Sequence, residues 1–269
     1  MRETMQKILI LSFSDLRSDP RVRRQIFALK DRYEITAVGL ADPGISGVAY
    51  LEAQFSNVGL FTSFKSALAL KMRCFERYYQ EKYALPDLRN KLKNQHFDLI
   101  IANDIDALPF ALSVTPMPRI FLDCHEYAPC EFEDQFLWRF FFKEFKEYLC
   151  RTYLKQCDAI STVCEGIADE YMRNFGVLPA VVTNAADYVE MSPAPVGREL
   201  VNLIHHGAAI PSRQIERMIR MMDFLDERFM LTLMLTKNDL AYYQKLKLQA
   251  ENNPRIAFRE PVHFSKIIN

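Results

Sequence analysis

The sequence predicts an α/β protein with two successive parallel-sheet domains. Apolar runs long enough for strands alternate with helix-like segments, and most of these runs are apolar throughout, as in strands covered on both faces. The alternation stops at YVEMSPAPVGREL, which contains two prolines and a glycine, and then restarts. We therefore expect a complete N-terminal domain over residues 1–187, a linker over 188–199 and a second, partial domain over 200–269.

The first strand and helix are predicted by the first 30 residues. KILILSF is a continuous apolar run, typical of a buried strand. In the following helix, Asp19 is the expected N-cap and Pro20 the first helical residue. Val22, Ile26 and Leu29 recur at helical spacing and mark the core face.

The rest of the first domain continues the pattern. The expected strands are YEITAVGL, VAYLEA, FDLIIAND, RIFLDCHE, DAISTV and AVVTNAAD. Four helical segments are expected. They are residues 61–95, a short helix in DIDALPFALSV, a long aromatic helical region over 127–155, and CEGIADEYMRNFG, with Gly176 as its C-cap. In the second domain we expect VNLIHHG, FMLTLMLT and RIAFREPV as strands. PSRQIERMIRMMDFLDE and KNDLAYYQKLKLQAENN are the expected helices.

Composition narrows the function classes. Lys plus Arg is 34 and Asp plus Glu is 34, so no overall positive charge predicts nucleic acid as a partner. The first apolar run is too short for a signal peptide, and no run approaches the ~18 apolar residues of a membrane span. Six cysteines without a CxxC pair indicate reduced thiols. We expect a cytoplasmic protein.

Polar clusters mark the ends of the predicted parallel strands, where ligands of such sheets collect. They are SFSDLRSDPR, ANDID, DCHEY and TVCEG. Neither DCHEY nor the HH pair has further ligands at a spacing typical of metal sites, so no metal is expected.

The order of these motifs resembles that of the GT-B glycosyltransferases, in particular the retaining family-4-like group. SDPRVRR, ANDIDALPFAL, DCHEYAP, CDAISTVCEGIADEYMRNFGVLPAVVTNAAD and LIHHGAAIPSRQIERMI are each similar to a segment of that group, in the same order. The chain departs from the pattern at Asn103, Cys164, Ala208 and Gln214, where the group commonly has His, Ser, Arg and Gly. The group's second domain also continues beyond Asn269.

The resemblance implies two Rossmann-like domains of GT-B type, the first for the acceptor and the second for the donor. It implies transfer of a hexose from a sugar nucleotide to a saccharide or lipid-linked acceptor, in cell-envelope polysaccharide or lipopolysaccharide synthesis, without cofactor or metal. One alternative is a truncated, non-catalytic relative acting as a nucleotide-binding module or inactive fragment. An NAD enzyme is disfavoured because the eight glycines form no GxGxxG.

The resemblance also implies residue roles. His125 and Glu126 would be catalytic, with His125 beside the transferred sugar; the alternatives are a structural hydrogen bond for His125 and helix capping for Glu126. Gly207 and Arg213 would bind the donor diphosphate at a helix start, while a solvated Arg213 is the alternative. His205 and His206 are expected to be structural.

Further strand-end residues are expected in the acceptor side or cleft, each with an ordinary structural alternative. Arg21 can reach an anion or be solvated, and Asp104, like Asp106, can cap a helix. The remaining candidates are Thr162, Glu165 and Asn184.

Two stretches rich in basic and aromatic residues are compatible with peripheral contact with the inner face of the membrane. They are FTSFKSALALKMRCFERYYQEKY and FLWRFFFKEFKEYLCRTYLK. The alternative is that these helices are buried against the sheet or the other domain.

Overall fold

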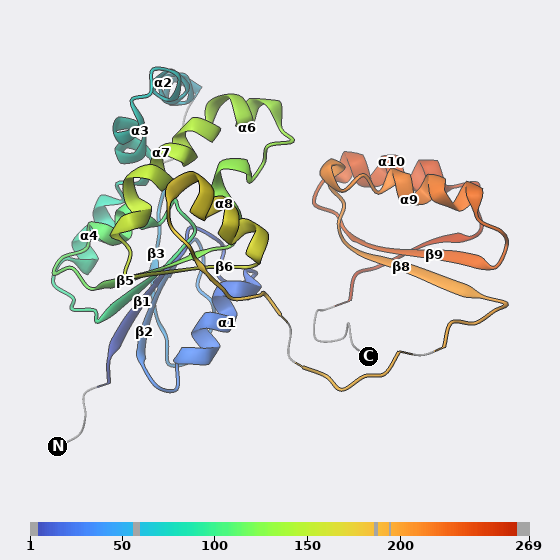
Figure 1. Cartoon of the computed structure of the whole chain (residues 1–269), viewed down its shortest axis with the longest axis horizontal. Helices are drawn as coiled ribbons and strands as arrows, with labels where there is room; N and C mark the ends of the chain where they lie inside the picture. The colour runs from blue at the N-terminus through green and yellow to red at the C-terminus, as the bar shows by residue number, and fades with distance from the viewer. Residues whose placement is uncertain (1–4, 56–59, 186–187, 194, 263–269) are drawn as a thin grey trace. The chain divides into compact units, whose positions relative to one another are not determined.

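The computed structural model describes residues 5–55, 60–185, 188–193 and 195–262 (Figure 1). The chain divides into two compact units, Met1–Ala186 and Asp187–Asn269. Each unit carries one parallel sheet with helices, so the predicted α/β class is confirmed.

The first unit is built on a seven-stranded sheet in the order β3-β2-β1-β4-β5-β6-β7, in which every pair is parallel. The strands are β1 Lys7–Leu11, β2 Glu34–Gly39, β3 Ala49–Glu52, β4 Leu99–Asn103, β5 Arg119–Cys124, β6 Ala159–Thr162 and β7 Ala180–Val181. In the centre, Leu9 pairs with Thr36 on one side and Ile100 on the other. This order places β1 and β4, the most apolar runs, inside the sheet, as their composition predicts.

Helix α1 (Pro20–Leu29) lies on one face of this sheet (Figure 1). Asp19 caps it as predicted, since its carboxylate accepts hydrogen bonds from the backbone of Arg21 at 3.0 Å and Val22 at 3.2 Å. Val22 and Ile26 are fully buried against β1 and β2. The cap and the core face together fix the helix beside the carboxyl ends of the strands.

The other face carries the larger core and the remaining helices. These are α3 Phe75–Tyr83, α4 Pro86–Leu92, α5 Leu108–Leu112, α7 Lys143–Tyr153 and α8 Glu165–Phe175, with short 3₁₀ turns at Ala128–Cys130 and Leu154–Gln156. Helix α8 ends at Gly176, which has the predicted left-handed conformation (φ 66°). Helices α2 (Leu60–Lys71) and α6 (Phe136–Phe141) lie outside α3 and α7.

The single aromatic helix predicted over 127–155 is wrong. The segment forms a 3₁₀ turn at Pro129, a turn region, and then α6 and α7. Pro129 lacks the N–H that a helix interior requires, so it starts an element and does not continue one. Of the two helices, α7 buries Phe145 and Leu149 in the core, whereas α6 has no buried residue.

The second unit has a three-stranded parallel sheet in the order β10-β9-β8. Its elements are β8 Val201–Ala208, α9 Glu216–Met221, β9 Phe229–Thr236, α10 Leu240–Ala250 and β10 Ile256–Arg259, with 3₁₀ turns at Pro211–Arg213 and Met222–Phe224. Both helices cover the same face, where Leu231, Leu233 and Leu246 form the core. The single helix predicted from Pro211 is wrong, because Gln214 has a left-handed backbone (φ 49°) that no α-helix accommodates.

Candidate functional site

Polar side chains from four elements of the first unit meet at the carboxyl ends of β4, β5 and β6. Gln25 of α1 donates a hydrogen bond to Asp123 at 2.7 Å and another to Asn103 at 3.0 Å. Ser161 of β6 donates to the second oxygen of Asp123 at 2.6 Å. Asp123 therefore lies at the centre of a network that joins α1 to three strands.

His125 extends this network just beyond the end of β5. Its Nε2 lies 3.2 Å from Asp123 Oδ2 and its Nδ1 lies 3.4 Å from Asp104 Oδ2. Its backbone N–H also donates to Asp104 Oδ1 at 3.1 Å. The ring is only 5% exposed, so both nitrogens face carboxylates and not solvent.

These contacts set the protonation of the ring. Burial alone would lower the pKa of His125, but the carboxylates of Asp104 and Asp123 outweigh it and raise that pKa to about 9. Burial likewise acts to raise the pKa of Asp123, yet hydrogen bonds from His125 and Ser161 hold it below its ordinary value. At neutral pH the pair is an imidazolium and a carboxylate. In this state His125 is a hydrogen-bond donor at both nitrogens and has no lone pair to act as a base.

Arg21 and Glu126 lie together at the edge of the same site. The Arg21 guanidinium is 3.7 Å from Glu126 Oε1, and both side chains are partly exposed. The alternative that Glu126 caps the next helical turn is not seen, since its carboxylate faces α1 and that turn has no side-chain cap. An exposed ion pair of this kind contributes little to stability, so an anionic ligand can replace Glu126 as the partner of Arg21 at little cost.

Helix capping by Asp104 or Asp106 is wrong. Asp104 has a left-handed backbone (φ 65°), and its carboxylate accepts from His125. Asp106 forms an ion pair with Lys146 of α7. Helix α5 starts two residues later, at Leu108, without a side-chain cap. Both carboxylates therefore belong to tertiary contacts.

The other predicted site residues of the first unit make no hydrogen bond or ion pair with His125 among the described residues. Thr162 is fully buried and donates to the Cys124 carbonyl at 2.9 Å, a structural bond. Glu165 is the exposed first residue of α8. Asn184 follows β7, and its side-chain oxygen accepts from Arg24 of α1.

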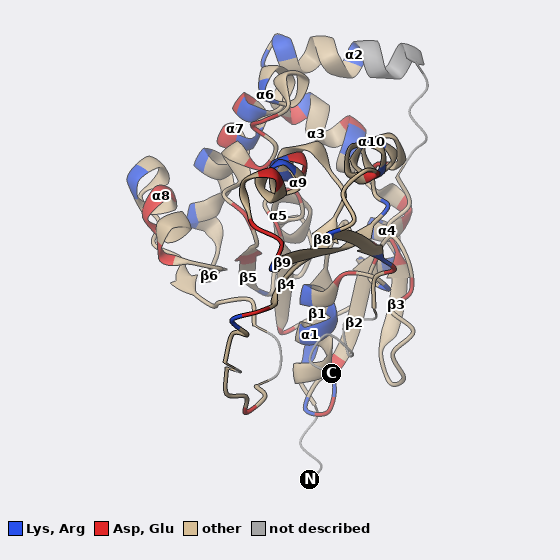
Figure 2. Ribbon diagram, turned by 90° about the vertical axis from the view of Figure 1, so that its right-hand side faces the viewer, with Lys and Arg blue, Asp and Glu red and all other residues tan. Residues whose placement is uncertain are grey.

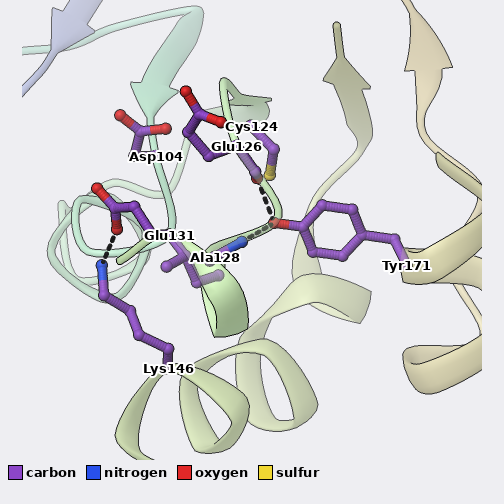
Figure 3. A pocket seen from close by; sticks show the side chains of 8 residues that line it. Asp104, Cys124, Glu126, Ala128, Glu131, Lys146 and Tyr171 are labelled. Atoms are coloured by element: carbon purple, nitrogen blue, oxygen red, sulfur yellow. Dashed lines mark hydrogen bonds and ion pairs between the residues drawn. The ribbon is translucent and has the colours of Figure 1, made fainter. Parts of the chain in front are cut away.

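A small cavity lies below the strand ends, with a volume of about 10 Å³, which is room for about one water (Figure 3). Lys146, Glu131, Asp104 and Glu126 line it, and the Tyr171 hydroxyl donates to the Glu126 carbonyl at 3.0 Å. Lys146 is paired with Glu131 at 3.1 Å as well as with Asp106. Burial would lower the pKa of Lys146, but these carboxylates raise it above its ordinary value, so the amine is charged.

The second unit carries its own polar cluster at the carboxyl end of β8. Gly207 has φ 147°, a conformation that L side chains rarely adopt. A Cβ placed on it would lie only 2.6 Å from Arg213 Nη1, so the guanidinium lies directly over this glycine. Arg213 belongs to the 3₁₀ turn and not to the start of α9, which begins at Glu216; the predicted contribution of a helix start at Arg213 is therefore wrong.

His205 adds a polar group to this second cluster. Its Nε2 is buried and has no hydrogen-bond partner among the described residues. Burial lowers the pKa of His205, and the positive charge of Arg213 lowers it further, so the ring is neutral at neutral pH. The cluster thus combines one cation, one neutral imidazole and a glycine whose missing side chain leaves room for that cation.

Sequence reasoning missed Gln25, Asp123 and Lys146. Asp123 lies within the DCHEY motif, and an acidic residue inside a buried strand was the available signal. Gln25 and Lys146 gave no comparable signal.

Within the described residues, no group of three or more His, Cys, Asp or Glu side chains is arranged to hold a metal ion. Over the same part of the chain, no helix has the length and hydropathy to cross a membrane.

Comparison with known proteins gives matches at the level of structure. No family model and no curated protein matches the sequence. The lipopolysaccharide outer core galactosyltransferase WaaB is similar with a TM-score of 0.61 and 12% identity, over 96% of this chain and 68% of WaaB. HepE of Anabaena in complex with UDP-glucose is similar with a TM-score of 0.56 and 15% identity, over 96% of this chain and 69% of HepE.

Two further structures extend the comparison. Sucrose-phosphate synthase of Thermosynechococcus elongatus gives a TM-score of 0.56 at 13% identity, over 96% of this chain and 71% of the synthase. TarM matches with a TM-score of 0.47, and the chain spans 33% of its length. The matches to WaaB, HepE and the synthase run through both units, as the order of the sequence motifs predicts. The fold of this chain is that of the GT-B glycosyltransferases.

Proposed function

We propose that this chain is a retaining glycosyltransferase that moves a hexose from a nucleotide sugar to a saccharide or lipid-linked acceptor in cell-envelope polysaccharide or lipopolysaccharide synthesis. The shared fold supports the reaction class. The named activity of WaaB and the UDP and UDP-glucose bound to HepE favour a uridine nucleotide as the donor and an envelope glycan as the product.

The observation that carries the proposal is the pairing of Arg213 with Gly207. Within the described part of the chain, no carboxylate lies within ion-pair distance of Arg213, so its charge is available to a ligand. Because Gly207 has no side chain, the guanidinium can lie against the backbone at the end of β8. A diphosphate fits such a site, because it brings negative charge to the guanidinium and can approach the strand end closely.

In the first unit, the proposed role of His125 is to donate a hydrogen bond to a sugar hydroxyl. The Asp104 side chain is 49% exposed and that of Asp123 is 19% exposed. A hydroxyl group would therefore displace Asp104 from Nδ1 more readily than Asp123 from Nε2. Arg21 and Glu126, which form the exposed ion pair beside it, would contact the same ligand.

Calorimetric titration of UDP into the whole chain tests the donor site. Arg213→Ala should weaken binding by about 1.5 to 3 kcal/mol, the value of a charge-assisted hydrogen bond. Arg217→Ala, at an exposed arginine of α9, is the matched control and should bind UDP normally. Equal affinity of both variants would place Arg213 outside the site, and no UDP binding at all would remove the proposal.

Transfer itself is tested by release of UDP from UDP-hexoses with glycan and lipid-linked acceptors. His125→Ala should abolish transfer, since it removes the side chain proposed to donate a hydrogen bond to the sugar. UDP binding without transfer to any acceptor would favour a non-catalytic nucleotide-binding module.

A further inference from the structure

One buried hydroxyl holds the backbone directly after His125. The Tyr171 hydroxyl, from α8, donates a hydrogen bond to the Glu126 carbonyl oxygen at 3.0 Å and accepts one from the Ala128 N–H at 3.1 Å (Figure 3). The Tyr171 residue is only 1% exposed. The two bonds therefore fix the chain on both sides of Tyr127, at the end of the segment that carries the two predicted catalytic residues.

Helix α8 is built to hold that hydroxyl in place. Its buried residues Ala168, Tyr171 and Phe175 recur at helical spacing. The Tyr171 ring packs edge-on against the Tyr127 ring, with the ring centroids 5.1 Å apart, and its centroid lies 6.1 Å from that of Phe175. The four charged residues of α8, shown blue and red in Figure 2, are not buried. Packing of the apolar face thus fixes the tyrosine ring, and with it the hydroxyl.

The held segment connects to the rest of the site in two places. At its start, the His125 ring lies between two carboxylates, at 3.4 and 3.2 Å. One residue later, Glu126 has its carbonyl oxygen on Tyr171 and its carboxylate 3.7 Å from the Arg21 guanidinium. Without the hydroxyl, the N–H of Ala128, a residue that is 6% exposed, would lose its acceptor in a place with little water. The backbone would then move to find another partner, and both site residues would move with it.

We propose that Tyr171 is a positioning residue of the site: its hydroxyl fixes the backbone after His125, so that the imidazole stays between its two carboxylates and Glu126 stays within reach of α1. The tyrosine acts through the two residues that it holds and not by contact with a ligand. An ordinary core tyrosine would add stability and leave the protonation of His125 unaffected. The consequence for sugar transfer rests on the proposed function, whereas the consequence for His125 does not.

NMR of His125 tests the proposal. Tyr171→Phe removes only the hydroxyl and keeps the packed ring. The His125 signal of histidine-labelled protein is identified by its absence in His125→Gln, and its pKa is read from a pH titration of the whole chain. In the parent, the carboxylates of Asp104 and Asp123 raise the pKa of the ring to about 9. In Tyr171→Phe the proton affinity of His125 should fall by roughly tenfold, because the imidazole loses contact with a carboxylate.

Tyr153→Phe is the matched control, since it removes a hydroxyl of α7 that bonds Glu76. His125 should titrate in this variant as in the parent. In transfer assays, Tyr171→Phe should lower kcat by roughly tenfold or more and leave the affinity for UDP unchanged, because the predicted donor residues belong to the second unit. A parent that transfers no sugar would remove the proposed function but leave the titration of His125 as a test of this inference.

Hydrogen exchange on the unaltered chain gives a second test that needs no variant. The Ala128 amide should exchange at least about tenfold more slowly than an unbonded amide, because the Tyr171 hydroxyl accepts its hydrogen. Two results would overturn the inference: an unprotected Ala128 amide in the parent, or the parental titration of His125 in folded Tyr171→Phe. Loss of stability with an unchanged His125 is the second of these results, and it makes Tyr171 an ordinary core side chain.

Discussion

Replacing His125 with glutamine should remove a pH-dependent part of the stability of the first unit. In the folded protein the carboxylates of Asp104 and Asp123 outweigh burial and raise the pKa of His125 from 6.5 to about 9. Because the folded value is the higher one, the stabilisation is complete below pH 6.5 and is lost as the pH rises through 9. The shift corresponds to about 3 kcal/mol of unfolding free energy.

The assay is urea unfolding followed by the fluorescence of Trp138, which reports on the first unit. Measured below pH 6.5 and again above pH 9, the difference in stability between the parent and His125→Gln should shrink by about 3 kcal/mol. His96→Gln, at a side chain that is 71% exposed, should show no comparable change and serves as the control. A constant difference between parent and His125→Gln across this range would refute the assignment of an imidazolium between two carboxylates.

Three further predictions concern Gly207 in the second unit and the ion pair of Lys146 with Asp106 in the first. Gly207→Ala should displace the Arg213 guanidinium and weaken UDP binding by about the same amount as Arg213→Ala, roughly 1.5 to 3 kcal/mol, while backbone strain lowers the melting temperature; normal UDP affinity in calorimetry would contradict this. Lys146→Met should destabilise the first unit by about 1.5 to 3 kcal/mol in urea, because it leaves two partly buried carboxylates without their cation. Lys146→Met combined with Asp106→Asn should be more stable than the single variant, and a double variant as unstable as the sum of both changes would argue against a coupled pair.

Local features of the fold follow from the sequence. Continuous apolar runs place β1, β4 and β5 in a buried parallel sheet, and the cap at Asp19 marks the start of α1. These signals depend on neighbours within a few residues. The break at Gln214 was missed because a left-handed residue inside an apparently periodic segment leaves no pattern. The break between α6 and α7 falls at Phe142, in a run of aromatic residues without glycine or proline, so the sequence carries no breaker signal there.

The candidate site was only partly predictable, because its bonds join distant parts of the chain. His125 was identified from its motif, but its protonation depends on Asp104, 21 residues away. Gln25 reaches Asp123 across 98 residues, and nothing on α1 distinguishes it from a solvated glutamine. Strand order and the rotation of α1 decide these contacts, and both are properties of the assembled sheet.

The hydrogen bond from Gln25 links the position of α1 to the protonation of His125, because both residues contact Asp123. Asp123 accepts from Gln25 and also faces His125, so a ligand that rotates α1 changes the donors around the carboxylate and thereby the proton affinity of the imidazole. Such a ligand exchanges protons with the solvent as it binds. Its binding enthalpy then depends on the heat of ionisation of the buffer. The slope of that dependence is the number of protons taken up or released when the ligand binds and α1 moves.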